Sequence, residues 1–212
     1  MKELDLEEQE QLEELKAWWK QNSTWIVTVL AILAAAIASY RGWQYYEGKQ
    51  GQEAAQLYFV LQNEASAGDV EKVRALTGQI MDKYPRTPFA SSAAMEAAKL
   101  NYGKGDAKSA KAQLQWVIDH AKDNPTKDLA RLKLAGVFLD EKDYAESLKL
   151  LDTKHDEAFA TLYDDMKGDV YFAQGKLADA RDAYKSAISK AGDKSAYRKY
   201  IQIKLDSLGD QG

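Results

Sequence analysis

The stretch GDVYFAQGKLADARDAYKSAI, residues 168–188, sets the expected fold of this chain. It places a small residue, Gly168, where two helices would have to pack closely, and a second glycine, Gly175, where the chain would turn. The packing positions of a second helix then recur at helical spacing, at Ala180, Tyr184 and Ala187. Residues 168–188 therefore predict two α-helices joined by a short turn.

The same pattern recurs at regular intervals along the chain. Its turn positions are separated by 37, 37 and 33 residues, at Gly68, Gly105, Lys142 and Gly175. The last interval is close to the period of about 34 residues in a tetratricopeptide repeat, which residues 168–188 resemble. We therefore expect about four helix pairs, the third matching least well because Ser147 replaces the usual alanine. A final segment, Ser195–Leu208, would cap the apolar face of the last repeat.

Composition supports an all-α fold and excludes several other classes of protein. All three prolines fall in short polar breaks where helices would end or begin, at Pro85, Pro88 and Pro125. The chain is 45% apolar and has a formal net charge of −4, so it is too apolar for a disordered chain and lacks the basic footprint of a nucleic-acid-binding protein. It has no cysteine, which excludes disulfides and Cys-ligated zinc.

One segment near the N-terminus has the length and composition of a membrane span. No residue from Gln21 to Tyr40 is charged, and twenty helical residues rise about 30 Å, the thickness of a bilayer's hydrocarbon core. Amphipathic aromatic rings bracket this segment as two belts, and the expected membrane-anchor residues are Trp18, Trp19, Trp25, Tyr40 and Trp43. We therefore predict a transmembrane helix over residues 21–41.

Two other interpretations of this segment are a buried core helix and a cleaved signal peptide. A buried core helix could be equally apolar, but it would give no reason for paired aromatic belts. A cleaved signal peptide would suit Ala36-Ile37-Ala38, but such peptides begin with a short basic region. Here about two dozen glutamate-rich residues precede the apolar run, so a signal anchor is the preferred interpretation.

The predicted span divides the chain into an acidic tail (residues 1–20), the transmembrane helix (21–41) and a repeat domain (42–212). Three lysines precede the span and two basic residues closely follow it, which slightly favours a cytoplasmic N-terminus. The tail holds seven acids and three lysines, so its net charge of −4 equals that of the whole chain. Its leucines and tryptophans fit an amphipathic helix leading into the membrane, while its acidity fits a flexible tail, and the sequence leaves both open.

Catalytic and metal-binding patterns are not found in the sequence. It has no nucleophile elbow, zinc-protease helix, P-loop or dinucleotide-binding glycine motif. His120 and His155 have no neighbouring ligand set. We therefore expect neither an enzyme nor a bound cofactor or metal.

Repeat register predicts a concave groove that could hold an apolar segment of a partner. The residues placed there are Tyr58, Met95, Lys99, Tyr102, Leu132, Leu139, Leu162 and Phe172, among the polar residues Gln62, Asp165 and Asp169. Alternatively the C-terminal helix fills the groove, which is the preferred interpretation for Leu132, Leu139 and Phe172. Tyr58, Met95 and Tyr102 are the stronger candidates for recognition.

Over essentially its full length the chain resembles the YfgM-type ancillary subunits of the bacterial Sec translocon. The resemblance rests on an ordered set of stretches: RGWQYYEGKQ (41–50), YPRTPFASSAAMEAAKLNYGKGD (84–106), LARLKLAGVFLDEKDYAESLKLLD (129–152), residues 168–188 and KLDSL (204–208). It implies a cytoplasmic tail, one inner-membrane anchor and a periplasmic repeat domain. It also implies association with the SecYEG channel and a periplasmic chaperone of the PpiD type, with a role in helping exported proteins, and it brings no catalytic residues.

A second function remains open at this point. A membrane-anchored repeat scaffold could regulate an envelope stress or signalling pathway through its cytoplasmic tail. Expected partners are therefore the translocon, the chaperone, unfolded exported proteins and membrane lipid, with no nucleic acid.

Overall fold

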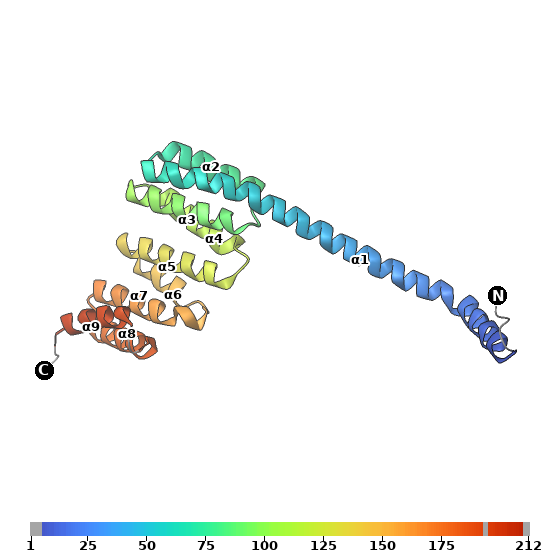
Figure 1. The fold of residues 1–212 in the computed structure, drawn as a ribbon. Coiled ribbons are helices and arrows are strands. Elements are labelled where there is room, and N and C mark those ends of the chain that lie inside the picture. Colours follow the sequence, from blue (N-terminus) through green and yellow to red (C-terminus); the bar gives the residue numbers. More distant parts are fainter. Residues whose placement is uncertain (1–5, 193–194, 210–212) are drawn as a thin grey trace. The chain divides into compact units, whose positions relative to one another are not determined.

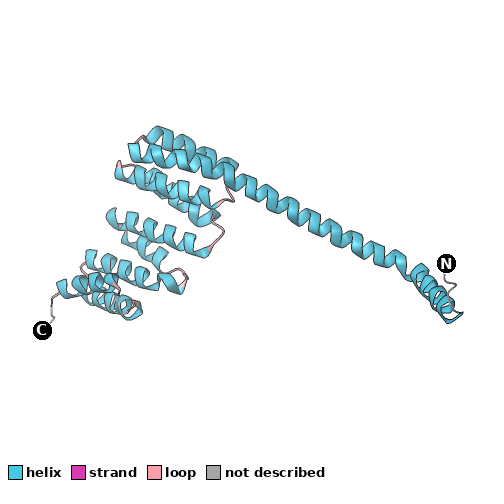
Figure 2. Cartoon of the chain, viewed as in Figure 1, coloured by secondary structure: helices cyan, strands magenta, loops and turns pink. Residues whose placement is uncertain are grey.

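The computed structural model describes residues 6–192 and 195–209, and within these ranges the chain is helical with no strand (Figures 1 and 2). The described helices are α1 (Leu6–Ala67), α2 (Val70–Lys83), α3 (Pro88–Gly103), α4 (Ala107–His120), α5 (Asn124–Asp140), α6 (Tyr144–Leu151), a 3-10 turn (Glu157–Phe159), α7 (Ala160–Ala173), α8 (Leu177–Lys190) and α9 (Ala196–Ser207). The prediction of an all-α fold is confirmed.

The chain forms two units, residues 1–49 and 50–212, and the first consists of most of α1. Within the described residues, α1 holds the one stretch that is long and apolar enough to cross a membrane. The side chains of this stretch are unburied, which argues against the core-helix alternative. The described part of the acidic tail, residues 6–20, is helical rather than irregular, and residues 1–5 lie outside the described range.

In the second unit, the predicted turns lie where helices end. Gly68, Gly105, Lys142 and Gly175 have φ angles of 75°, 86°, 63° and 74°, in the left-handed region that ends helices and favours glycine. At the first three turns the next residue is an aspartate whose carboxylate accepts a backbone N–H three residues on, at Asp69, Asp106 and Asp143. The four predicted turn positions are therefore confirmed.

The core of the repeat domain is a series of small apolar layers rather than one large centre. Consecutive helices from α2 to α9 pack against each other in chain order (Figure 1). Alanine supplies much of the contact on α3, where Ala90, Ala93, Ala94, Ala97 and Ala98 are all buried. Because each layer contacts mainly its neighbours, the end layers need a cover. At the C-terminal end, Ile201 of α9 and its C-cap residue Leu208 pack in one cluster with Tyr184.

Two small residues show how closely the helices of a pair approach. A Cβ at Gly168 would lie 2.3 Å from Cε1 of Tyr184, so only glycine fits at this crossing of α7 and α8. In the third repeat the buried hydroxyl of Ser147 donates a 2.8 Å hydrogen bond to the carbonyl of Ala135. The serine that weakens the repeat pattern is thus accommodated with its polar group satisfied.

Candidate functional site

The residues predicted to line a groove divide into an interior and an exposed group. Leu132 is buried and packs in one cluster with Leu151 on α6 and Tyr163 on α7, and Leu139 and Leu162 pack against the same cluster. Helices α6 and α7, rather than α9, therefore supply their cover.

The two groove candidates nearest the N-terminal end of the repeats are half-buried. Tyr58 packs against the layer formed by α1, α2 and α3, with its ring centroid 5.8 Å from that of Phe89. Met95 packs against two neighbouring layers of α3, α4 and α5. Only part of each side chain is accessible to a partner.

Three predicted groove residues have exposed side chains: Lys99, Tyr102 and Phe172. Lys99 lies beside a shallow hollow of about 350 Å³ between α3 and the end of α1. Ala65 and Leu100 are among the residues that line it. Phe172 is 51% exposed, so α9 does not cover it. These three residues are the part of the predicted set that a partner could reach without a rearrangement.

Tyr102 also links two repeats. Its hydroxyl on α3 donates a 2.5 Å hydrogen bond to Oδ2 of Asp140 at the end of α5. This hydrogen bond, with some desolvation, raises the pKa of Tyr102 to about 12. The pair holds the exposed edges of α3 and α5 together through a charge-assisted contact.

The Tyr102–Asp140 pair predicts a specific pH dependence. Because the folded pKa lies above the ordinary value of about 10, the pair stabilises the fold below pH ~10 and loses that contribution as the pH rises through about 12. NMR of ¹³C-labelled tyrosine should show one resonance, absent in Tyr102→Phe, that titrates near 12 and moves toward 10 in Asp140→Ala. A Tyr102 resonance with a midpoint near 10 in the unaltered chain would contradict the pairing.

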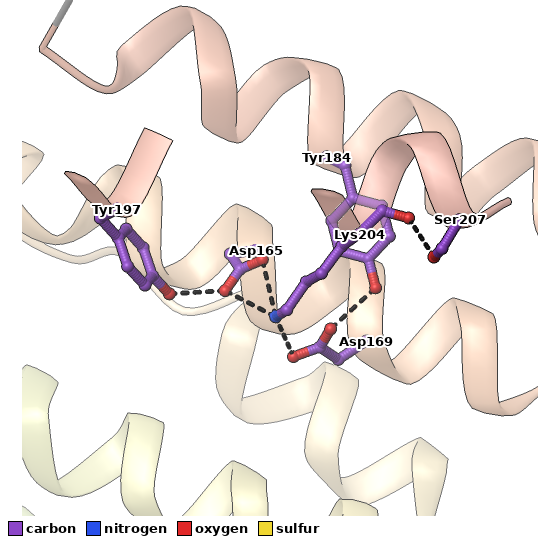
Figure 3. Close-up of polar contacts among 6 residues, drawn as sticks. All are labelled: Asp165, Asp169, Tyr184, Tyr197, Lys204 and Ser207. Carbon is purple, nitrogen blue, oxygen red and sulfur yellow. Dashed lines mark hydrogen bonds and ion pairs between the residues drawn. The ribbon is translucent and has the colours of Figure 1, made fainter. Parts of the chain in front are cut away.

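A polar cluster joins the C-terminal helix to α7 (Figure 3). The ammonium of Lys204 on α9 lies 2.9 Å from both carboxylate oxygens of Asp165 and 2.7 Å from Oδ2 of Asp169. Tyr197 donates a hydrogen bond to Asp165 and Tyr184 donates one to Asp169. We call these five residues the α7–α9 latch, since they connect the cap to the preceding repeat.

Burial and pairing act together on the titration of the latch. Burial lowers the pKa of Lys204, but hydrogen bonds to Asp169 and Asp165 outweigh it, so the pKa lies above its usual value. Burial, followed by the hydrogen bond to Asp165, raises the pKa of Tyr197, and burial followed by the bond to Asp169 does the same for Tyr184. Because these pKa values are raised, Lys204 is a cation and both phenols are protonated at neutral pH.

The sequence pattern placed the two acidic residues of the latch but did not identify their partner. Asp165 and Asp169 fall at groove positions of the repeat register, but their partner Lys204 lies 39 and 35 residues away. The pattern indicated that Ser195–Leu208 would cap the repeats, and α9 has nearly these bounds, with Ser195 and Leu208 as its caps. The pattern did not indicate which lysine would form an ion pair with Asp165 and Asp169.

The predicted membrane-anchor residues, by contrast, all belong to α1 in the first unit. Trp18, Trp19, Trp25, Tyr40 and Trp43 are exposed along the helix. Trp25 donates its indole N–H to Asn22, and the hydroxyl of Tyr40 accepts from Gln44. Such rings are free to reach the headgroup zones on both sides of a span.

The described surface offers exposed side chains for contacts with another chain. Among the described residues, no group of three or more His, Asp or Glu side chains could hold a metal ion. His155 is stacked on Tyr163 with ring centroids 4.0 Å apart, and His120 is stacked on Trp116 at 4.5 Å. The geometry suits recognition of another chain through exposed apolar, aromatic and charged side chains.

Comparison with known proteins places this architecture in a family. Residues 16–210 match the tetratricopeptide repeat-like domain family. The chain is 32% identical over 204 residues to a Neisseria gonorrhoeae protein named ancillary SecYEG translocon subunit, covering 96% of this chain and 98% of the relative. Relatives with the same name from Haemophilus influenzae and Escherichia coli K12 are 24% and 23% identical, with 95% or more of both chains covered. The chain belongs to the family of ancillary SecYEG translocon subunits, whose repeat domain is tetratricopeptide repeat-like.

Proposed function

We propose that this chain is a non-enzymatic, single-pass inner-membrane protein that acts as an ancillary subunit of the SecYEG translocon. The observation that carries the proposal is the alignment of nearly the whole chain, anchor and repeats together, with relatives of that name. In this proposal residues 1–20 are a cytoplasmic tail, 21–41 cross the membrane and 42–212 form the periplasmic domain. The apolar stretch of α1 and its exposed aromatic residues support the anchor.

The repeat domain is the proposed contact with folding factors and clients. Its four turns would delimit four helix pairs, with α9 as the cap. Lys99, Tyr102 and Phe172 are accessible, and they combine an ammonium, a phenol and an apolar ring. Such a surface fits an extended or helical segment of a periplasmic chaperone of the PpiD type or of an unfolded exported protein.

Site-specific crosslinking of the full chain in cells tests this function. A photo-crosslinking residue at Lys99, Tyr102 or Phe172 should yield adducts with the chaperone or with newly exported chains. The same residue at Lys133, an exposed lysine of α5, is the control and should yield few. Purification of the chain from solubilised membranes should recover SecYEG.

The outcomes separate the parts of the proposal. A preparation free of SecYEG would contradict the translocon association. Equal crosslinking at Lys133 and at the three accessible positions would contradict the assigned recognition surface. Adducts with the chaperone alone would identify a docking surface and remove direct client binding from the proposal.

A further inference from the structure

The helical tail presents an apolar face that the first unit leaves uncovered. Leu12, Leu15 and Trp19 follow at intervals of three and four residues, so they share one side of α1. All three are exposed, Leu15 by 60% and Trp19 by 51%. A hollow of about 320 Å³ lies beside Leu15, Lys16 and Trp19. An apolar stripe of this kind is the anchoring pattern of helix recognition.

The opposite side of the same helix is acidic. Glu7, Glu10 and Glu14 repeat the same spacing and are exposed, while Glu8 lies one turn before Leu12 on the apolar side. Residues 7–20 contain five glutamates and two lysines, a net charge of −3. The tail helix is therefore amphipathic, with an apolar stripe and an acidic stripe.

Charge decides between a lipid and a protein as the occupant of the apolar face. Anionic headgroups on the cytoplasmic leaflet attract basic helices and repel an acidic one. The cytoplasmic loops of membrane-embedded proteins carry an excess of lysine and arginine. An acidic helix held next to the bilayer by its own anchor therefore meets complementary charge on a neighbouring membrane protein and not on the lipid.

We propose that the tail helix, residues 7–20, docks its Leu12–Leu15–Trp19 face on a basic cytoplasmic loop of a membrane-embedded partner, which is the SecYEG channel. The inference rests on the proposed function and adds to it the surface through which the channel is engaged. Attachment to the same bilayer raises the effective concentration of tail and loop, so a short helix suffices for binding. The acidic stripe speeds the encounter with the basic loop, and the apolar stripe provides the buried contact that slows dissociation.

Co-purification of the full chain with SecYEG, both in detergent, provides the test. One variant neutralises the acidic stripe (Glu7→Gln, Glu10→Gln, Glu14→Gln) and another removes apolar anchors (Leu12→Ser, Leu15→Ser). The matched control removes three exposed charges from the repeat domain (Glu157→Gln, Asp179→Asn, Asp182→Asn). Each tail variant should recover SecYEG at least roughly fivefold less efficiently than the unaltered chain, as expected when an interface hot spot is lost, while the control should not differ. Recovery by the unaltered chain should also fall with rising salt.

Two patterns of recovery separate the inference from the proposed function. If the tail variants and the unaltered chain recover SecYEG equally, the docking surface is overturned and the proposed function stands. If the unaltered chain recovers none, the proposed function is overturned, and the docking proposal with it.

A label on Gln11→Cys decides between protein and lipid, since the chain has no cysteine of its own. In vesicles of mixed anionic and zwitterionic lipid, the label should be shielded from an aqueous quencher only when SecYEG is co-reconstituted. Shielding by lipid alone would overturn the proposal in favour of a membrane-bound tail. Absence of shielding in both preparations would also overturn it.

Discussion

Replacing Lys204 with methionine should destabilise the C-terminal end of the repeat domain by about 3 kcal/mol or more, the usual penalty for removing one partner of a buried ion pair. Methionine keeps the length of the side chain but leaves Asp165, which is only 3% exposed, without its cation beside Asp169. Because α9 is held to α7 by this contact, the cap should open first. Hydrogen exchange of residues 196–207 measures the opening directly, and denaturant unfolding measures the total loss.

Two further variants make the Lys204 prediction specific. Lys199→Met changes an exposed lysine of the same helix and should leave exchange in α9 unchanged. Adding Asp165→Asn to Lys204→Met removes the uncompensated charge and should restore part of the stability. If Lys204→Met exchanged like the unaltered chain, the latch would have no role in holding the cap.

Replacing Gly168 with alanine should destabilise the fold by about 1–2 kcal/mol. Overpacking costs about 1–3 kcal/mol, and the higher helix propensity of alanine offsets up to about 1 kcal/mol of this cost. The added Cβ would fall 2.3 Å from Cε1 of Tyr184. That ring has little freedom to move, since it is buried and its hydroxyl is bonded to Asp169 at 2.7 Å. Urea unfolding of the full chain in detergent measures the difference.

Gly136 on α5 provides the matched control for this prediction. A Cβ there would meet only Cε of Met166, at 3.8 Å, which is an ordinary contact. Gly136→Ala should therefore stabilise the domain by about 0.5–1 kcal/mol through helix propensity alone. A stabilising Gly168→Ala would show that α7 and α8 can separate without loss and would contradict the close crossing.

The arrangement of helices was predictable because the residues that end and pack them act locally. A glycine that ends a helix needs only its own left-handed backbone, and the aspartate after it caps the next helix three residues on. Lys142 could be identified in the same role, without a glycine, from its place in the repeat interval. The requirement for a small residue at Gly168 also followed, since it depends on one neighbouring helix.

The exposure of the groove residues was less predictable. Leu132 and Phe172 were both assigned to the concave face by register, yet one is buried in the α5–α7 layer and the other is half exposed. The position of a residue in the repeat pattern predicts which way its side chain points from its own helix. Burial depends on how far the next helix pair extends over it, and neighbouring residues in the sequence do not encode that distance.

The sequence by itself determined an apolar span, helical repeats, their turns and the need for a C-terminal cap, because each depends on composition or on spacing within a few helical turns. Only the tertiary structure decided which charges meet. The ammonium of Lys204 reaches Asp165 and Asp169 because α8 folds back and brings α9 over α7, across more than thirty residues of chain. Long-range pairing of this kind depends on the packing angles of whole helices, which local residue patterns leave open.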